Sequence, residues 1–391
     1  MTKSSQAAVF PLFRHRNGQW AKKVNGKHRY FGADRDEALK RWLETKDDLL
    51  AGVEPTPVAD SPTIAELANL YIDRCRLRVE SDEMAGSTAI EYENVLHRMI
   101  GFVGREAQPA TWKPIDFAKL KERLHEPIKR TAGPRGGLKG KSVKRRSATT
   151  VAIDIRAIKA FLNWCSKSAL IPPPHFGPDF VPPSQKKLRK VKRESGRRDL
   201  SPADILSIIE SASVNLKPLI FLGINAGIGN KDLSLFTLDR LPEMTGDVWI
   251  DYPRNKTEAD RRFCLWPETR DAIATYLAKR PGPAGSSNTN LVFLTRQGSA
   301  WVRGDGSSRM DAIGQAFKKA RTDAGVERGT FYDLRRTFQT VANETGDFQA
   351  ARLVMGHSSH ANDMTDRYTQ AIGDDRIRRV INHVREWLYA S

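Results

Sequence analysis

The sequence has few cysteines and no long apolar run. Its three cysteines, Cys75, Cys165 and Cys264, stand far apart, which predicts neither a disulfide framework nor a structural zinc site. No stretch approaches the roughly 18 apolar residues that a membrane-spanning helix requires. Residues 1–8 are too polar for the apolar centre of a signal peptide. We therefore expect a cytoplasmic protein that holds no metal ion and does not enter a membrane.

Acidic residues are scarce relative to basic ones. The 391 residues include 64 Lys and Arg but only 46 Asp and Glu, which gives a formal net charge of +18. Apolar residues make up 39% of the chain, so it can still bury a core, and its length allows two or three domains. Such an excess of positive charge indicates a polyanionic partner. Nucleic acid, and with it a nucleoid-associated location, is the first expectation.

Residues 9–52 predict a small sheet backed by a helix. Two Asn-Gly pairs separate strands expected at 10–14, 19–24 and 27–31, because type I′ turns need positive φ at both central positions. An apolar stripe predicts a helix at 36–50. No acid occurs between Phe10 and Ala33, so the sheet is either a solvated surface or a face that enters a DNA groove. The DNA-binding residues predicted here are Arg14, Arg16, Trp20, Lys22, Lys23, Lys27 and Arg29.

Residues 62–170 predict a helical domain. A capping box at Thr63 and Glu66 starts the first helix, and further helices are expected at 87–103, 114–124 and 149–167. The segment 129–147 is rich in glycine and basic residues and holds no acid, so it is either a flexible loop or a loop on the phosphate backbone. The second interpretation assigns DNA contacts to Lys139, Lys141, Lys144, Arg145 and Arg146.

A proline-rich and then basic linker is expected at 171–198. Such a run is often only a flexible solvated segment. In a chain with other basic patches it is better explained as a linker that follows the DNA backbone. The residues predicted to bind DNA are Lys187, Arg189, Lys190, Lys192 and Arg193.

Residues 199–391 predict helices with a small β insertion. Ser201-Pro202 starts a helix, with the serine as N-cap and the proline in the first turn. Strands expected at 248–252 and 262–266 flank a turn at 255–260. A helix at 374–388 has apolar residues at helical spacing. The fold class predicted for the whole chain is mainly α with small β elements, α+β.

Four motifs in this last segment resemble the signature of the tyrosine recombinases, the phage-integrase family. They are Phe331-Tyr332-Asp333-Leu334-Arg335 on a helix, Met355-Gly356-His357 at a turn, Tyr368 shortly after it, and Lys256 between the two strands. The resemblance extends to the other segments. It implies an arm-type DNA-binding domain at 1–55, a core-binding domain at 62–170, the linker at 171–198 and a catalytic domain at 199–391.

The resemblance also implies a chemistry that needs no cofactor. Tyr368 would attack a DNA phosphate and form a 3′-phosphotyrosine. Arg335 and His357 would bind the phosphate oxygens, because a phenol of pKa about 10 needs cations that favour the phenolate and the crowded phosphorus. Lys256 would protonate the leaving 5′-oxygen. Tyr332, which stands where the family has a histidine, would donate one hydrogen bond. The expected partner is double-stranded DNA with attachment-type sites, recombined by integration or excision.

The chain departs from the family pattern at Gly229, where an arginine is expected within the run 226–233. Losing such a donor costs roughly 10²–10³ in rate, unless Lys231 or Arg336 replaces it. Two alternatives to a recombinase therefore stay open: a catalytically degenerate DNA-binding relative, and a type IB topoisomerase. The helix at 374–388 either packs on its own domain or joins protomers into a homotetramer on DNA.

Overall fold

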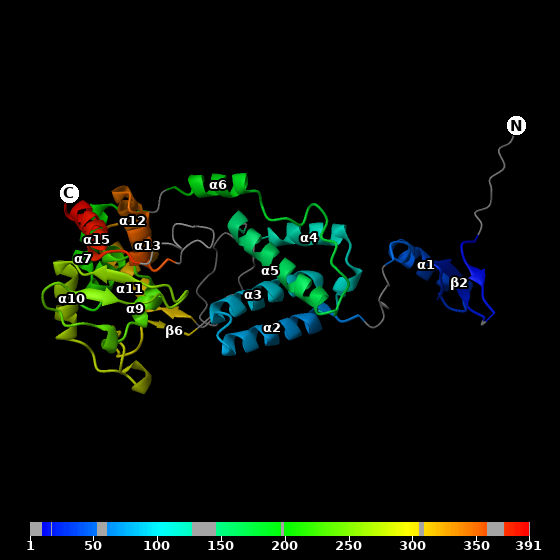
Figure 1. Ribbon diagram of the computed structural model, residues 1–391, viewed down its shortest axis with the longest axis horizontal. Helices are drawn as coiled ribbons and strands as arrows, with labels where there is room; N and C mark the ends of the chain where they lie inside the picture. The colour runs from blue at the N-terminus through cyan, green and yellow to red at the C-terminus, as the bar shows by residue number, and fades with distance from the viewer. Residues whose placement is uncertain are drawn as a thin grey trace. The chain divides into compact units, whose positions relative to one another are not determined.

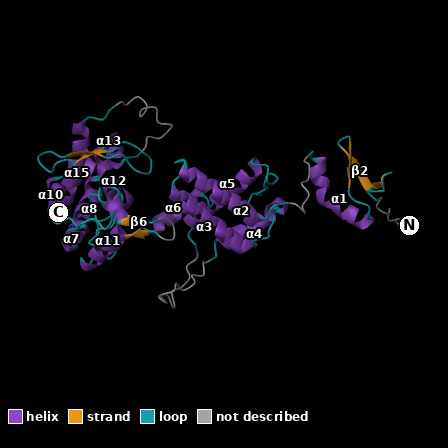
Figure 2. Ribbon diagram, turned by 90° about the horizontal axis from the view of Figure 1, so that it is seen from below, coloured by secondary structure: helices purple, strands orange, loops and turns teal. Residues whose placement is uncertain are grey.

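The computed structural model describes residues 10–16, 18–52, 61–126, 146–196, 199–304, 309–357 and 371–390. These residues fall into two compact units, the first from Met1–Cys75 and Tyr92–Ser184, the second from Arg76–Glu91 and Gln185–Ser391. Helices dominate, and the strands form small antiparallel sheets (Figures 1 and 2). The predicted α+β fold class is confirmed.

The N-terminal sheet has the predicted order β1-β2-β3, with strands Phe13–Arg14, Trp20–Val24 and Lys27–Tyr30. The strands are shorter than expected at their ends. Asn25 and Gly26 have φ values of 51° and 82°, as a type I′ turn requires, whereas Asn17 lies outside the described residues. Helix α1, Arg35–Leu50, starts where the Asp34 carboxylate accepts hydrogen bonds from the backbone of Asp36 and Glu37.

A small core joins this sheet to α1. It contains Leu12, Val24, Phe31, Ala38, Trp42 and Leu49, with Phe10, Trp20 and Leu39 packed against it. Phe31 and Trp42 meet edge to face with their ring centroids 5.6 Å apart. Because side chains alternate along a strand, the face of the sheet that carries Trp20 and Val24 is the one that packs on the helix.

Four helices follow in the chain: α2, Ile64–Glu80; α3, Gly86–Val103; α4, Pro114–Leu124; and α5, Ala148–Lys167. All four were predicted within one residue at their starts. The Thr63 amide donates to the Glu66 carboxylate at 2.8 Å, which confirms the capping box. Aromatic rings fill much of the core here, as where Tyr71 and Phe161 meet at 5.3 Å between centroids.

The basic part of the linker folds into a helix that the sequence did not predict. Helix α6 spans Gln185–Glu194 and has no buried residue. Lys, Arg and Gln are good helix formers, and Glu194 lies 3.8 Å from Lys190 one turn earlier. An exposed helix has few apolar residues, so the spacing of apolar residues did not predict α6.

The second unit surrounds one large core. Its helices are α7, Pro202–Ser211; α8, Lys217–Asn225; α9, Asn230–Ser234; α10, Pro267–Leu277; α11, Ala312–Asp323; α12, Phe331–Ala342; α13, Phe348–Met355; and α15, Asp374–Tyr389. Strands β4, Trp249–Asp251, and β5, Arg262–Cys264, form the predicted hairpin, and β6, Val302–Arg303, pairs with β7, Met310–Asp311. Helices α8 and α12 pack so closely that a Cβ on Gly223 would lie 3.0 Å from Leu334 Cδ1.

Helix α15 packs on its own unit. Ile377, Val380, Ile381, Val384 and Leu388 are buried in its core, and the Trp266 indole donates to the Ile381 carbonyl at 3.1 Å. Arg262 and Asp374 add a bidentate ion pair between β5 and the start of the helix. The apolar face of α15 is therefore occupied within the same chain, in agreement with the first of the two alternatives.

Candidate functional site

Arg335 lies at the centre of the candidate site. It stands on the buried face of α12, which a capping box at Thr330 and Asp333 starts, and it is only 4% exposed. Its guanidinium donates to the Gly227 carbonyl just after α8 and to the Met355 carbonyl, the latter at 2.9 Å. The planar fork of an arginine can reach two such acceptors at once. Arg335 thus joins the end of α8 to the end of α13.

The turn 355–357 requires glycine at its centre. Gly356 has φ +61°, and φ values of this sign are unfavourable for other residues. Its amide donates to the Leu353 carbonyl and the His357 amide to the Arg352 carbonyl, which closes the C-terminus of α13. A Cβ here would also lie 2.9 Å from both Arg254 Cβ and Arg261 Nε. The turn therefore sets His357 beside two arginines of the β4–β5 hairpin.

The β4–β5 hairpin carries three basic residues of interest. Arg254 is half-buried, and among the described residues no acid pairs with its guanidinium. Arg261 is fully buried, and its Nη2 lies 2.5 Å from an Asp232 carboxylate oxygen. Its Nε and Nη1 are buried and find no hydrogen-bond partner in the described part of the chain. Lys256 is exposed at the turn.

A second contact fixes the hairpin to α9. Tyr252 donates its hydroxyl to the Asp232 backbone carbonyl at 2.8 Å. The guanidinium of Arg261 lies over the Tyr252 ring, 5.5 Å from its centroid. Burial, and then the charge of Asp232, raise the pKa of Tyr252 to about 12, so this phenol stays protonated at neutral pH.

The charges of these residues act on one another. We call Arg254, Arg261, Arg335 and His357 the cation cluster. Burial first, and then Arg254 and Arg261, lower the pKa of Arg335 to about 10, so it still carries its charge at neutral pH. Burial and the neighbouring arginines lower the pKa of His357 to about 4, so its imidazole is neutral there. The site thus combines a neutral hydrogen-bonding ring with closely placed guanidiniums.

Lys231 and Arg336, the two residues suggested as replacements for the missing arginine, do not belong to the cation cluster. Arg336 pairs with Asp333 at 2.6 Å and lies over the Tyr332 ring. Lys231 is exposed on α9. Gly229 is the N-cap of α9, and a Cβ placed on it meets no atom within 4 Å. Tyr332 is half-exposed at the start of α12, and Tyr368 lies outside the described residues.

The cations of the N-terminal sheet do not share one face. Lys22 donates to the Pro11 carbonyl at 2.8 Å and lies over the Trp42 ring of α1. By strand alternation Arg14, Trp20 and Arg29 share this helix-facing side. Lys23 lies on the opposite face, while Arg16 and Lys27 lie next to the turns. The strand period of two thus places Lys23 on the other side of the sheet from Arg14, Lys22 and Arg29. Their contacts with DNA stay a prediction.

The opposite face of the sheet is aromatic. Phe13, His15, His28 and Tyr30 contact one another with ring centroids 5.0–6.5 Å apart, over the fully buried Ala21. The Tyr30 hydroxyl lies 3.4 Å from His15 Nε2. Sequence reasoning missed this group because it counted charges rather than pairing residues across strands.

Of the basic loop predicted at 129–147, only its end is described. Arg146 is paired with Asp154, and both side chains are buried. Arg98 adds a second ion pair to the same carboxylate at 2.9 Å. The structure therefore gives Arg146 a structural role in place of the predicted exposed one. Lys139, Lys141, Lys144 and Arg145 lie outside the described residues.

The five predicted residues of the linker are all exposed or half-exposed on α6. They are Lys187, Arg189, Lys190, Lys192 and Arg193. With Lys186 they place six basic residues on ten positions, against the single acid Glu194. Such a helix offers a dense row of charge to a polyanion.

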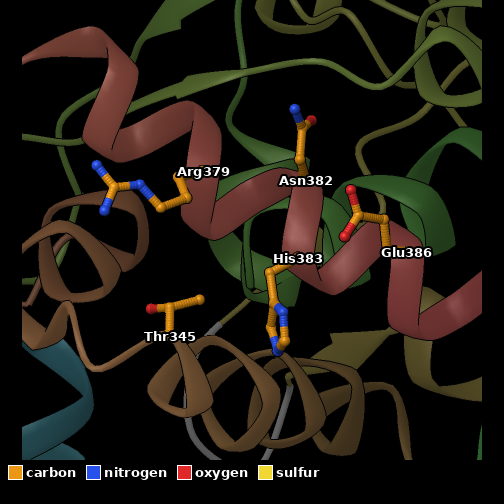
Figure 3. A pocket seen from close by; sticks show the side chains of 5 residues that line it. All are labelled: Thr345, Arg379, Asn382, His383 and Glu386. Carbon is orange, nitrogen blue, oxygen red and sulfur yellow. The ribbon is translucent and has the colours of Figure 1, made fainter.

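The described residues can be compared with what a metal site, a membrane-spanning helix and a ligand pocket require. No group of three or more His, Cys, Asp or Glu side chains is placed to hold a metal ion in the described ranges. No described helix is long and apolar enough to cross a membrane. A pocket of about 350 Å³ is lined by Thr345, Arg379, Asn382, His383 and Glu386 (Figure 3). None of these residues belongs to the cation cluster.

DNA-bound integrases are among the solved structures that this chain resembles. A lambda integrase dimer bound to a COC′ core site is 14% identical, with a TM-score of 0.55 over 95% of this chain and 99% of that one. A lambda integrase tetramer bound to a Holliday junction is also 14% identical, with a TM-score of 0.55 over 94% and 99%. The Tn1549 transposon integrase in complex with transposon right end DNA is 17% identical, with a TM-score of 0.53 over 83% and 100%.

The fold is that of the tyrosine recombinases, as the sequence motifs predicted. No protein-family model matches the sequence, and no curated protein is similar to it in sequence. Sequence reasoning missed Arg254 and Arg261, because it singled out Lys256 alone from the hairpin. The signal that could have found them is their position, because Arg254 and Arg261 directly flank the predicted turn at 255–260.

Proposed function

We propose that this protein is a site-specific DNA recombinase that cuts and rejoins strands through Tyr368. The observation that carries the proposal is the meeting of Arg335 with the turn that holds His357, beside the hairpin that bears Lys256. Three separate motifs of the sequence thus converge on one place. Their residue types suit an anionic phosphate whose charge grows during the reaction.

The proposed reaction is a balanced transesterification. The phenol of Tyr368 loses its proton to solvent, and its oxygen forms a bond to phosphorus while the bond from phosphorus to the 5′-oxygen breaks. Lys256 gives the leaving 5′-oxygen a proton. The product is a 3′-phosphotyrosine and a free 5′-hydroxyl. A 5′-hydroxyl from a second strand reverses the same steps, so no external energy source is consumed.

Arg335 and His357 act on the phosphate in different ways. The charge of Arg335 stabilises the negative charge that develops on the nonbridging oxygens. His357, neutral because its pKa is about 4, donates one hydrogen bond without adding to the repulsion among the arginines. Tyr332, half-exposed at the start of α12, is proposed to donate another.

The remaining surfaces are proposed to hold double-stranded DNA at attachment-type sites. Domain limits of 1–55, 62–170 and 199–391 stay our proposal, with α6 in the segment that joins the last two. Exposed cations such as Lys23 and Arg189 suit phosphate contacts. Assembly into a homotetramer through α15 would require the helix to leave the core that it occupies here. A protein that acts on cellular DNA is expected in the cytoplasm, at the nucleoid.

Covalent capture tests the proposal. The wild-type chain is incubated with a pool of nicked duplexes of randomised sequence, so that the short strand beyond the cleavage point diffuses away. Adducts that survive denaturation are then recovered and sequenced. We expect a recovered consensus site and an adduct that Tyr368→Phe abolishes while DNA affinity changes by less than about threefold. An adduct that still forms in Tyr368→Phe would remove this residue from its role.

The second candidate is a catalytically degenerate DNA-binding protein, and Gly229 is the observation that favours it. The N-cap of α9 carries no side chain where the family pattern has an arginine. If the wild type binds one sequence selectively but leaves no adduct with any member of the pool, this candidate replaces the first. Relaxation of supercoiled plasmid without a preferred sequence would instead indicate a topoisomerase.

A further inference from the structure

We propose that Arg254 contacts the scissile phosphate and replaces the guanidinium that is missing at Gly229, with Arg261 as the buried residue that positions it. The proposal rests on the proposed function and assigns a further catalytic residue to it. Arg254 belongs to the β4–β5 hairpin, whereas the expected arginine would stand at the start of α9. The site would thus keep its number of guanidiniums while drawing one from another element.

The charge balance of the cation cluster calls for an anion. Arg254, Arg261 and Arg335 contribute three positive charges, Asp232 contributes one negative charge, and the neutral His357 contributes none, which leaves +2. Like charges held together away from water repel strongly. A phosphodiester carries one negative charge and its five-coordinate transition state carries two. The cluster therefore complements the transition state better than the ground state, which is the condition for catalysis.

Arg254 is the member with the most donors left for that anion, beside the remaining N–H groups of Arg335. Arg335 uses its two terminal nitrogens on the Gly227 and Met355 carbonyls, and Arg261 is engaged by Asp232. Arg254 has no acidic partner among the described residues and is half-buried, so its guanidinium remains reachable. Its Cβ lies against Gly356, the residue before His357. Its guanidinium can therefore join the same phosphate as the imidazole.

Arg261 is assigned a positioning role. It is fully buried and ties the hairpin to α9 through Asp232, the residue three positions after Gly229. Its Nε would lie only 2.9 Å from a Cβ on Gly356, so it also fixes how closely the hairpin approaches the turn. Two of its guanidinium atoms, Nε and Nη1, have no partner among the described residues, although buried donors are nearly always paired. These two donors are left without an acceptor in the described part of the chain, while the charge of Arg261 is balanced by Asp232.

Cleavage kinetics test the assignment. The substrate is the nicked duplex recovered with the wild type, carrying a 5′-bridging phosphorothiolate, so that the leaving group needs no proton from Lys256. We expect Arg254→Ala to lower the single-turnover rate of adduct formation by about 10²–10³, the usual effect of removing one donor to a developing oxyanion. Arg254→Lys should recover only a small part, because an ammonium lacks the planar fork. DNA affinity should fall by less than about tenfold.

Arg262→Ala is the matched control. Arg262 is the same residue type on β5, but its guanidinium pairs with Asp251 and Asp374 and lies over Trp249, away from the turn. Its removal should change the rate by less than about threefold. Melting temperatures of all variants establish that they fold. Arg261 is tested as the pair of substitutions Arg261→Gln with Asp232→Asn, which removes both buried charges together.

A rescue experiment tests whether an arginine at position 229 can take over the role of Arg254. A Cβ on Gly229 meets nothing within 4 Å, so Gly229→Arg is the variant that restores an arginine there. In the Arg254→Ala background it should raise the cleavage rate at least about tenfold. An Arg254→Ala variant that folds and cleaves at the wild-type rate would overturn this assignment and leave the proposed function standing. A wild type that forms no adduct at all would overturn both.

Discussion

Two regions of the second unit are rich in basic residues but differ in how far those residues are buried. In the cation cluster, Arg335 is buried against two carbonyls, Arg261 is buried against a carboxylate and Arg254 is half-buried. Their charges help to lower the pKa of His357 to about 4. On α6, none of the six basic residues is buried, and Glu194 is the one acid of the helix. A charge in a low-dielectric site interacts strongly with a charged atom bound next to it. An exposed charge is screened by salt within about 10 Å at 0.1 M.

The two regions are therefore expected to contribute differently to DNA binding and to catalysis. Exposed cations contribute affinity through release of counterions, which depends on salt and hardly on geometry. Buried cations contribute to the transition state, which depends on geometry and little on salt. Substitutions in the cluster should therefore change rates, and substitutions on α6 should change affinities.

Arg335→Lys should have the largest effect. A lysine cannot reach the Gly227 and Met355 carbonyls and a phosphate together. We expect the rate of adduct formation to fall by about 10³, roughly 4 kcal/mol of transition-state stabilisation. The control is Arg336→Lys, the next residue on α12, which is paired with Asp333 and is more exposed. It should change the rate by less than about threefold, and equal losses in both variants would contradict the separate role of Arg335.

Gly356→Ala should damage the cluster through its backbone. Both Gly356 and Gly346 have positive φ, of 61° and 75°, so alanine is strained at either position. Only at Gly356 would the Cβ also clash with Arg254 and Arg261, whereas nothing lies within 4 Å at Gly346. We expect Gly356→Ala to reduce the free energy of unfolding by about 1–3 kcal/mol more than Gly346→Ala. Denaturant titration of the two variants measures the difference, and equal values would show that the hairpin gives way freely.

Neutralising α6 should lower affinity without changing the chemistry. We expect replacement of Arg189, Lys190 and Arg193 by glutamine to reduce the slope of log K against log salt concentration by up to about 0.9 for each phosphate that the helix no longer neutralises. At saturating DNA the cleavage rate should stay within about twofold of the wild type. Fluorescence anisotropy across salt concentrations measures the slope. An unchanged slope would mean that the helix does not bind the phosphate backbone.

Local signals predicted much of this fold. Pro114 and Asp116 mark the start of α4, and the expected limits of 114–124 are those observed. The capping boxes at Thr63 and Ser201 act within four residues, so the sequence contains all that is needed to find them. The β4–β5 hairpin followed from patterns of the same short range.

Contacts between distant segments could not be predicted in this way. Arg254 and Arg261 lie far from the Gly356 turn in the sequence, and only the tertiary structure brings their atoms to 2.9 Å from its Cβ position. Arg146 looked like part of a basic loop, yet its partner Asp154 lies on α5, in a helix that the loop precedes. For the sheet cations, the count of charges did not include the alternation that places Lys22 and Lys23 on opposite faces.

The smallest predicted effect concerns the pH dependence of folding. Arg335, Arg254, Arg261 and Arg352 face His357, and together with burial they lower the pKa of His357 from 6.5 to about 4. The unfolded chain therefore binds a proton that the folded chain does not between these values, so this residue contributes stability above pH 6.5 that is lost as the pH falls towards 4. Denaturation at about pH 7 and pH 5 of the wild type and His357→Gln isolates the contribution, because the carboxylates are common to both. The wild type should lose more stability than the variant over this interval.

A bound phosphate would offset the positive charge of the arginines. The imidazole resonance of His357 should therefore titrate at higher pH in the DNA complex than in the free protein. An equal pKa with and without DNA would place the phosphate elsewhere.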